Sequence, residues 1–198
     1  MKKLLRCFVA IELPDEIKKE LAKIQKFLKE KNVFEGKYAG VKNLHLTLKF
    51  LGGINAGEIE KVKNRLGKIR IKKFNIELKD LGLFPMKKRG GVFKKFNQVY
   101  KKVRKVMWVG ANNPSLKKLK KEIDESLKDL FEKEVNFKGH ITLARIYRIK
   151  NKEKFEGYFK SLKIHKKKFL VEKFFLKKSE LSPEGSSYKT LKEFGLEA

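Results

Sequence analysis

The strongest constraint on this chain is a four-residue pattern that occurs twice along it. HLTL begins at His45 and HITL begins at His140, in a sequence of 198 residues with 3 histidines. Side chains in a β-strand alternate between two faces, so His45 and Thr47 share one face while the neighbouring leucines share the other. The same alternation places His140 and Thr142 together. Each motif is therefore predicted to lie on a strand with one apolar face and one polar face.

The segments ahead of the two motifs follow a similar order. Residues 4–12 form an apolar run that predicts a strand, and apolar residues recur at helical spacing over 14–31. Before the second motif, MWVG at 107–110 predicts a strand, and a helix with a leucine stripe begins at Asn113 and Pro114. The chain thus reads as two copies of one plan. If a pseudo-two-fold axis relates them, both polar faces meet around a single small anion.

The remaining sequence mixes helices and strands. A further amphipathic helix is predicted after Asn55, with Glu58 at the capping position. Strands are predicted near 45–51, 71–84, 104–110, 139–147, 168–178 and 188–194. The lysine-rich residues 87–103 show little periodicity and are interpreted as a basic insertion or long hairpin between the halves. Helices and strands are therefore expected to mix throughout the chain, which can form one domain or two tightly joined lobes.

The charge of the chain indicates the class of its partner. There are 51 Lys and Arg against 23 Asp and Glu, a formal net charge of +28. Such a field attracts polyanions, so nucleic acid is the leading partner. Lysine enrichment is also typical of hyperthermophile proteins, and this second interpretation stays open beside the first.

The single cysteine and the start of the chain bear on where the protein works. Cys7 excludes a disulfide within the chain, and its apolar neighbours predict a buried thiol. The basic start resembles a signal peptide, but Arg6 and Glu12 interrupt it and no small-residue cleavage site follows. No run reaches transmembrane length. A cytoplasmic protein with no membrane partner is expected.

Two histidines are what a metal-free reaction at a phosphate ester requires. Imidazole titrates near pH ~6.5, so one ring can accept a proton while the other donates one. The hydroxyls of Thr47 and Thr142 would donate to the non-bridging phosphate oxygens. A lone histidine beside leucines is more often structural, but two matching contexts 95 positions apart (140 minus 45) favour catalysis. His165, in KIHKKK, lacks such a context and is interpreted as solvated surface.

Longer stretches around the motifs resemble a known family. These stretches are RCFVAIELP at the start, NLHLTLKFLG at 43–52, GLFP at 82–85, MWVG at 107–110, FKGHITLARI at 137–146 and the tail from FFLKKSEL to YKTLKEFGL. Together they resemble the 2H phosphoesterase superfamily, specifically the RNA 2′,3′-cyclic phosphodiesterases once named 2′-5′ RNA ligases. The resemblance implies one bilobal α+β domain over 1–198. Each lobe is then an antiparallel sheet with helices on its outer face, and the catalytic cleft lies between the lobes.

The resemblance also implies a reaction and roles for residues. The reaction is hydrolysis of a terminal 2′,3′-cyclic phosphate on RNA to a 2′-phosphate, with no metal, other cofactor or obligate protein partner. His45 is then the proton donor and His140 the proton acceptor. Tyr38 stands where an aromatic is common and Arg145 follows the second motif, so both are expected to bind substrate. Gly139 departs from the family, in which proline is common there, and would loosen the entry of the strand.

Other functions compete with this one. An ATP-driven RNA ligase is disfavoured because the chain has neither a Gly-x-x-x-x-Gly-Lys-Ser/Thr loop nor a Lys-x-Asp-Gly motif. Zinc is disfavoured because there is no histidine pair at helical spacing and no Cys-x-x-Cys. Two alternatives stay open: 2′-5′ RNA ligation as the reverse reaction in the same site, and RNA binding without turnover. The intact histidines and threonines argue against the latter.

Overall fold

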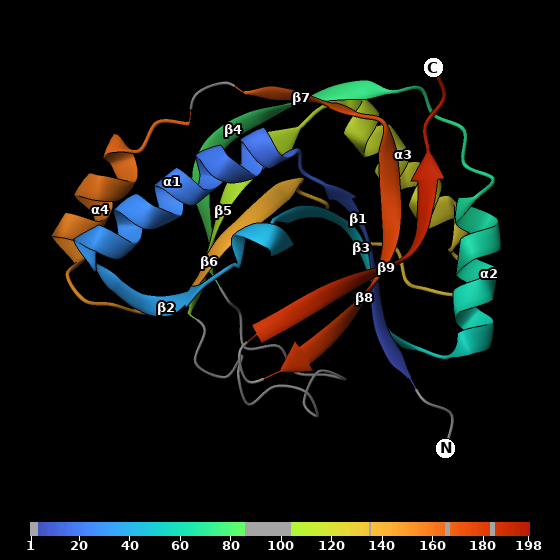
Figure 1. Ribbon diagram of the computed structural model, residues 1–198, viewed down its shortest axis with the longest axis horizontal. Coiled ribbons are helices and arrows are strands. Elements are labelled where there is room, and N and C mark those ends of the chain that lie inside the picture. The colour runs from blue at the N-terminus through green and yellow to red at the C-terminus, as the bar shows by residue number, and fades with distance from the viewer. Residues whose placement is uncertain (1–3, 86–103, 135, 165–166, 183–184) are drawn as a thin grey trace.

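The computed structural model describes residues 4–85, 104–134, 136–164, 167–182 and 185–198 (Figure 1). The basic segment 87–103 and His165, both interpreted from the sequence, lie outside these residues.

Within the described ranges, nine strands form one curled antiparallel sheet with four α-helices packed against it, and a short 3-10 helix, η1 (Val41–Asn43), precedes β3. The strands are β1 (Leu5–Glu12), β2 (Phe34–Tyr38), β3 (His45–Ile54), β4 (Phe74–Pro85), β5 (Lys105–Asn112), β6 (His140–Ile149), β7 (Lys168–Val171), β8 (Lys173–Ser182) and β9 (Gly185–Gly195). The helices are α1 (Asp15–Lys31), α2 (Ala56–Leu66), α3 (Pro114–Ser126) and α4 (Lys152–Ser161). The α+β class predicted from the sequence is confirmed.

Two matching half-sheets meet at the centre of this sheet. The strand order is β7-β4-β5-β6-β3-β1-β8-β9, and β2 pairs with β6 outside that path. The motif strands β3 and β6 are neighbours through the antiparallel pair Leu46 and Ile141. β1 flanks β3 as β5 flanks β6, which is the relation that the repeated motif predicts. The half-sheets are not halves of the chain, because β4 joins β5 whereas the C-terminal β8 and β9 join β1.

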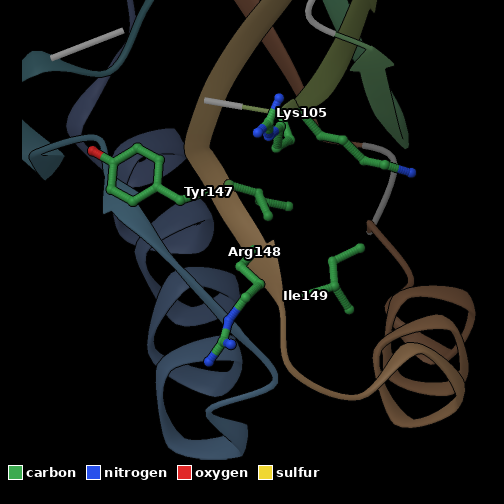
Figure 2. A pocket seen from close by; sticks show the side chains of 6 residues that line it. Lys105, Tyr147, Arg148 and Ile149 are labelled. Atoms are coloured by element: carbon green, nitrogen blue, oxygen red, sulfur yellow. The ribbon is translucent and has the colours of Figure 1, made fainter. Parts of the chain in front are cut away.

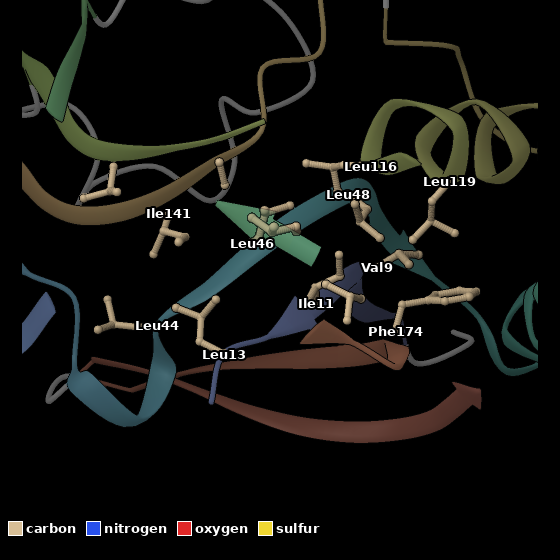
Figure 3. Close-up of a cluster of buried hydrophobic side chains, with 14 of the residues drawn as sticks. Val9, Ile11, Leu13, Leu44, Leu46, Leu48, Leu116, Leu119, Ile141 and Phe174 are labelled. Atoms are coloured by element: carbon tan, nitrogen blue, oxygen red, sulfur yellow. The ribbon is translucent and has the colours of Figure 1, made fainter. Parts of the chain in front are cut away.

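The apolar faces of the motif strands lie in one core. Each of the leucines that alternate with the first motif is at most 2% exposed, namely Leu44, Leu46 and Leu48. His45 and Thr47, on the other face of β3, are partly exposed. Leu116 and Leu119 of α3 cover this part of the core (Figure 3). The predicted alternation is confirmed, and each fully buried leucine contributes about 1.5–3 kcal/mol to folding.

The segment 168–178 folds differently from the single strand that its pattern predicts. It contains two strands with Glu172 between them, and β7 pairs with β4 while β8 pairs with β1. The carbonyl of Glu172 accepts a hydrogen bond from the backbone of Leu196 over 2.7 Å, and the backbone of Lys73 donates to the carbonyl of Glu197 over 2.9 Å. The sheet therefore curls until its two ends meet. The prediction was wrong because the apolar residues of KFLVEKFFL continue on both sides of the break, which only the exposed Glu172 and Lys173 mark.

Several local expectations can be compared with the structure. Asn55 and Glu58 form a reciprocal capping box at the start of α2, as predicted.

Cys7 is 1% exposed, and burial raises the pKa of its thiol to about 11, so it is an inert core residue. Gly139 leaves no room for a side chain, since a Cβ there would lie 2.1 Å from the carbonyl oxygen of Ala111, and its effect on the entry of the strand stays a prediction. No helix in the described ranges is long and apolar enough to cross a membrane.

Candidate active site

The two motif histidines are held by the same hydrogen bond. Nδ1 of His45 lies 2.7 Å from the carbonyl oxygen of Asn43, and Nδ1 of His140 lies 2.8 Å from that of Lys138. A carbonyl oxygen can only accept, so Nδ1 carries the proton in both rings. Each neutral imidazole therefore presents the lone pair of Nε2. Both histidines therefore have the same tautomer, and in both a backbone carbonyl two residues earlier fixes it.

The threonines complete the two motifs on the same face of the sheet. The Thr47 hydroxyl donates to Nε2 of His45 over 3.0 Å. Because Leu46 pairs with Ile141 in antiparallel register, His45 lies toward Thr142 and Thr47 toward His140. The charge of His140 contributes to lowering the pKa of His45, as expected for neighbouring rings. The structure thus brings the four motif residues to one face.

A β-bulge in the first motif changes which face the following residues occupy. Thr47 and Lys49 pair with adjacent residues of β1, so Leu48 is an extra residue in β3. Leu48 and Lys49 both turn into the core as a result. Phe50 then lies on the histidine face, which is the face of the sheet that carries His45 and Thr47, and its side chain is 64% exposed. Sequence reasoning missed Phe50, although it occupies the same position in HLTLKF as Arg145 does in HITLAR.

The second motif has the same bulge, and it places Arg145. Thr142 and Ala144 pair with adjacent residues of β5, so Leu143 is the extra residue in β6. Leu143 and Ala144 are both fully buried. Simple alternation from His140 would put Arg145 in the core, but the bulge turns it to the histidine face. Its charge also contributes to lowering the pKa of His45.

Aromatic rings enclose the first histidine. The centroid of the His45 ring lies 5.1 Å from that of Phe8 on β1 and 5.1 Å from that of Tyr188 on β9. Phe8 and Tyr188 also contact each other edge to face, with centroids 5.0 Å apart. Three distant strands therefore hold this imidazole in a partly desolvated position.

Another aromatic pair encloses the second histidine. The rings of Phe84 on β4 and Trp108 on β5 stack with centroids 4.7 Å apart, and Phe84 meets His140 edge to face at 5.0 Å. The ammonium of Lys138 lies 4.1 Å from the Trp108 ring centroid. Gly82 permits this packing, because a Cβ there would lie 2.0 Å from the indole. The sequence showed GLFP and MWVG as familial stretches but gave their aromatic residues no role.

Burial lowers the pKa of both imidazoles. The pKa of His45 falls to about 4, chiefly through burial and further through the charges of Lys177, Arg145 and His140, against the hydrogen bond to Asn43. Burial also lowers the pKa of His140. Both rings are therefore neutral at pH 7 in the protein alone. A bound anion would stabilise the protonated form of either ring and raise its pKa.

Tyr38 lines a cavity on the side of the sheet that faces α1, and its pairing with the buried Ala144 places it on the core face rather than beside His45 and His140. It pairs with Ala144 from β2, and burial raises the pKa of its hydroxyl to about 12. Its ring lies 5.2 Å from that of Phe34, and the ammonium of Lys29 lies 5.0 Å from its centroid. Residues of α1, β2 and β6 line this cavity of about 410 Å³. A role for Tyr38 in substrate binding stays a prediction.

A second cavity of about 410 Å³ lies farther along β6, beyond Arg145. It is lined by Arg104 and Lys105 at the start of β5 and by residues 146–149 of β6. Tyr147 projects toward α1 and β2, whereas Ile149 projects toward α4 (Figure 2). Basic side chains, namely Arg104, Lys105 and Arg148, therefore also lie beyond the histidine face. Among the described residues, no three His, Cys, Asp or Glu side chains gather as metal ligands.

Comparisons with known proteins agree with this geometry. A family model described as LigT like Phosphoesterase matches residues 11–93 and 109–188, which include both motifs. An RNA 2′,3′-cyclic phosphodiesterase of Methanocaldococcus jannaschii is 34% identical over 192 residues, covering 96% of this chain and 100% of that protein. One of Archaeoglobus fulgidus is 31% identical over 193 residues, covering 96% and 99%.

Solved structures have the same fold. Escherichia coli LigT in its apo form superposes with a TM-score of 0.71 at 23% identity, covering 99% of both chains. The protein TT0787 of Thermus thermophilus superposes with a TM-score of 0.69 at 25% identity, covering 96% of this chain and 97% of that one. With its paired motifs on one face of a shared fold, the chain belongs to the LigT-like phosphoesterase family of the 2H superfamily.

Proposed function

We propose that this protein hydrolyses the terminal 2′,3′-cyclic phosphate of RNA to a 2′-phosphomonoester without a metal ion. The observation that carries the proposal is the pair of imidazoles in one tautomer, each beside a threonine, on one face of the sheet. The names of the relatives from M. jannaschii and A. fulgidus support the same substrate. The net charge of +28 favours a polyanionic partner.

In the proposed reaction, Nε2 of His140 takes a proton from water, whose oxygen attacks phosphorus. The bond from phosphorus to the 3′-oxygen breaks, and Nε2 of His45 gives its proton to that oxygen. The products are a 2′-phosphate and a 3′-hydroxyl. Because Asn43 and Lys138 hold the Nδ1 protons, the transfers use Nε2, and the Thr47 hydroxyl that donates to Nε2 of His45 in the free protein would donate to the phosphate instead.

Neighbouring groups would stabilise the phosphate during this reaction. Thr47 and Thr142 would donate hydrogen bonds to its non-bridging oxygens, and Arg145 would offset their charge. The phosphate anion would in turn raise the pKa of His45 from about 4, so that this ring can carry the proton it donates. The exposed ring of Phe50 lies at the matching position of the other motif and offers a surface for a base.

The test is incubation of purified protein in EDTA with an RNA oligonucleotide that ends in a 2′,3′-cyclic phosphate. Liquid chromatography and mass spectrometry with 2′- and 3′-phosphate standards identify the product, and a 3′-hydroxyl oligonucleotide is the control. We expect the 2′-phosphate alone. Binding without any product would support an RNA-binding protein instead, and activity that needs added zinc or magnesium would contradict the metal-free mechanism.

The roles of the histidines can be separated with a substrate whose 3′-oxygen is replaced by sulfur. Thiolate is a good leaving group and needs little help from an acid. We therefore expect His45→Ala to recover much of its rate on this substrate, while His140→Ala does not. The opposite result would exchange the two assignments.

A further inference from the structure

A buried cluster of charges connects the strand of the first motif to the segment that leads into the second. Lys49 lies on β3 just past the HLTL motif, and its side chain is 3% exposed. Its ammonium donates to Oδ1 of Asp124 on α3 over 2.6 Å and to the carbonyl oxygen of Glu132 over 2.8 Å. Lys120, one turn before Asp124, donates to the other carboxylate oxygen over 2.5 Å. Two buried cations thus share one buried carboxylate.

The fold itself does not require a charge at this position. Lys49 follows the bulge of the first motif, and the residue at the matching place in the second motif is Ala144, which is fully buried. Buried ion pairs are costly to desolvate and are often no more stable than apolar side chains of similar volume. The two motifs therefore differ at this position, and packing alone does not explain why the first motif has a buried charge there.

The cluster contacts three residues that precede His140 in the chain, namely Glu132, Glu134 and Phe137. These residues form the approach to His140. Lys49 holds the backbone at Glu132. The ammonium of Lys120 lies 3.7 Å from the Glu134 carboxylate and 5.5 Å from the centroid of the Phe137 ring. These contacts attach the approach to α3 and to β3 before it reaches the second motif.

The end of this approach fixes the ring of His140. The carbonyl oxygen of Lys138 accepts the Nδ1 proton of His140, and the orientation of that carbonyl follows the backbone before it. Gly139 is packed against α3 and β5, since a Cβ there would lie 2.8 Å from Leu116 and 2.1 Å from the Ala111 carbonyl oxygen. A shift of the approach would therefore turn the Lys138 carbonyl away from the imidazole.

We infer that Lys49, Asp124 and Lys120 are positioning residues for the reaction proposed above. They attach the approach to His140 to the strand that carries His45, so the second imidazole keeps its Nδ1–H tautomer opposite the first. The kinetic part of this inference rests on the proposed function, whereas the tautomer can be measured without any substrate.

The decisive variant is Lys49→Met. It leaves Asp124 paired with Lys120, one negative charge with one positive, so the fold is expected to survive. We expect kcat to fall on the order of 10- to 100-fold, as for a small misplacement of a reacting group, with KM changed less than about twofold. Nitrogen-15 NMR of the imidazoles should show a mixture of tautomers at His140 and an unchanged tautomer at His45. Lys49→Arg keeps a cationic donor and should restore much of the loss.

A matched control removes another cation that contacts the end of α3. Arg65 of α2 donates to Asp129 over 2.7 Å and to the carbonyl oxygen of Ser126, the last residue of α3, over 3.2 Å. Arg65→Met should leave kcat and both tautomers unchanged. If Lys49→Met does not fold, Phe137→Leu at a partly exposed position serves instead and should shift the His140 tautomer in the same direction.

The possible results separate this inference from the proposed function. An unchanged His140 tautomer in a folded Lys49→Met variant overturns the inference, whether or not kcat falls. Equal losses in Lys49→Met and Arg65→Met also overturn it, because the effect would then be general. If the unaltered protein does not hydrolyse the cyclic phosphate, the proposed function fails while the NMR comparison still decides the role of the cluster.

Discussion

Leu46 of β3 pairs with Ile141 of β6, and this antiparallel pair joins the two motif strands. Both side chains are fully buried, so the polar residues beside them are held on the opposite face in a fixed register. Each histidine then lies toward the threonine of the other motif. The proposed reaction uses both strands at one phosphate.

Removal of either imidazole should abolish most of the activity. We expect His45→Ala and His140→Ala each to lower kcat by at least ~10²-fold, because each transfers a proton in the same step. The double variant should fall by much less than the product of the two losses. Turnover of the cyclic-phosphate oligonucleotide measures this, and RNA affinity is the control. Near-normal turnover in either single variant would exclude the two-histidine mechanism.

The threonines should contribute less than the histidines. Thr47→Val and Thr142→Val keep the shape of the side chain and remove the hydroxyl that would bind phosphate oxygen. Each should lower kcat/KM by less than the loss of its histidine, and a serine at either position should restore part of the rate. Steady-state kinetics of the valine and serine variants make the comparison. If both valine variants matched the unaltered protein, the threonines would be structural.

The dependence of the rate on pH should differ between free and bound protein. Burial lowers the pKa of both imidazoles, to about 4 for His45, so the bell of kcat/KM should lie on the acid side of pH ~6.5. A bound phosphate anion stabilises the protonated rings and raises both pKa values. The bell of kcat should therefore lie at higher pH than that of kcat/KM. Paired pH profiles test this, and a shift in the opposite direction would contradict it.

Replacing two glycines by alanine should change the stability of the fold in opposite directions. A Cβ at Gly82 would lie 2.0 Å from the buried indole of Trp108, so Gly82→Ala should destabilise the fold by about 1–3 kcal/mol. Nothing lies within 4 Å of a Cβ at Gly157 in α4, so Gly157→Ala should stabilise it by about 0.5–1 kcal/mol. Denaturant unfolding measures both. A Gly82→Ala variant of normal stability would mean that the indole moves freely.

The polar face of the motifs could be predicted from the sequence, but the position of Arg145 on it could not be derived from alternation. Alternation of side chains along the strand correctly puts His140 and Thr142 on the same face. The same alternation puts Arg145 on the core face with Ile141, which is wrong. The bulge at Leu143 reverses that alternation. A bulge depends on pairing with another strand, so its position is not encoded in the spacing of the motif alone.

The helix α4 and the strand β2 escaped prediction for a local reason. Phe155 is the one buried residue of α4, and lysines surround it, so the helical stripe is weak. β2 has one buried residue, Phe34, and a glycine at its centre. The aromatic partners of the histidines were missed for a different reason, since β1, β4, β5 and β9 supply them from distant parts of the chain.

The position of β8 beside β1 also determines how the chain must fold. Arg6 pairs with Ser179, which is 173 positions later (179 minus 6), so β1 is synthesised long before the strand that pairs with it. Closing so long a loop costs entropy before any contact repays it, which makes folding slow. Until β8 arrives, the nascent chain exposes one edge of β1 to other molecules, and that edge is where aggregation during synthesis would begin.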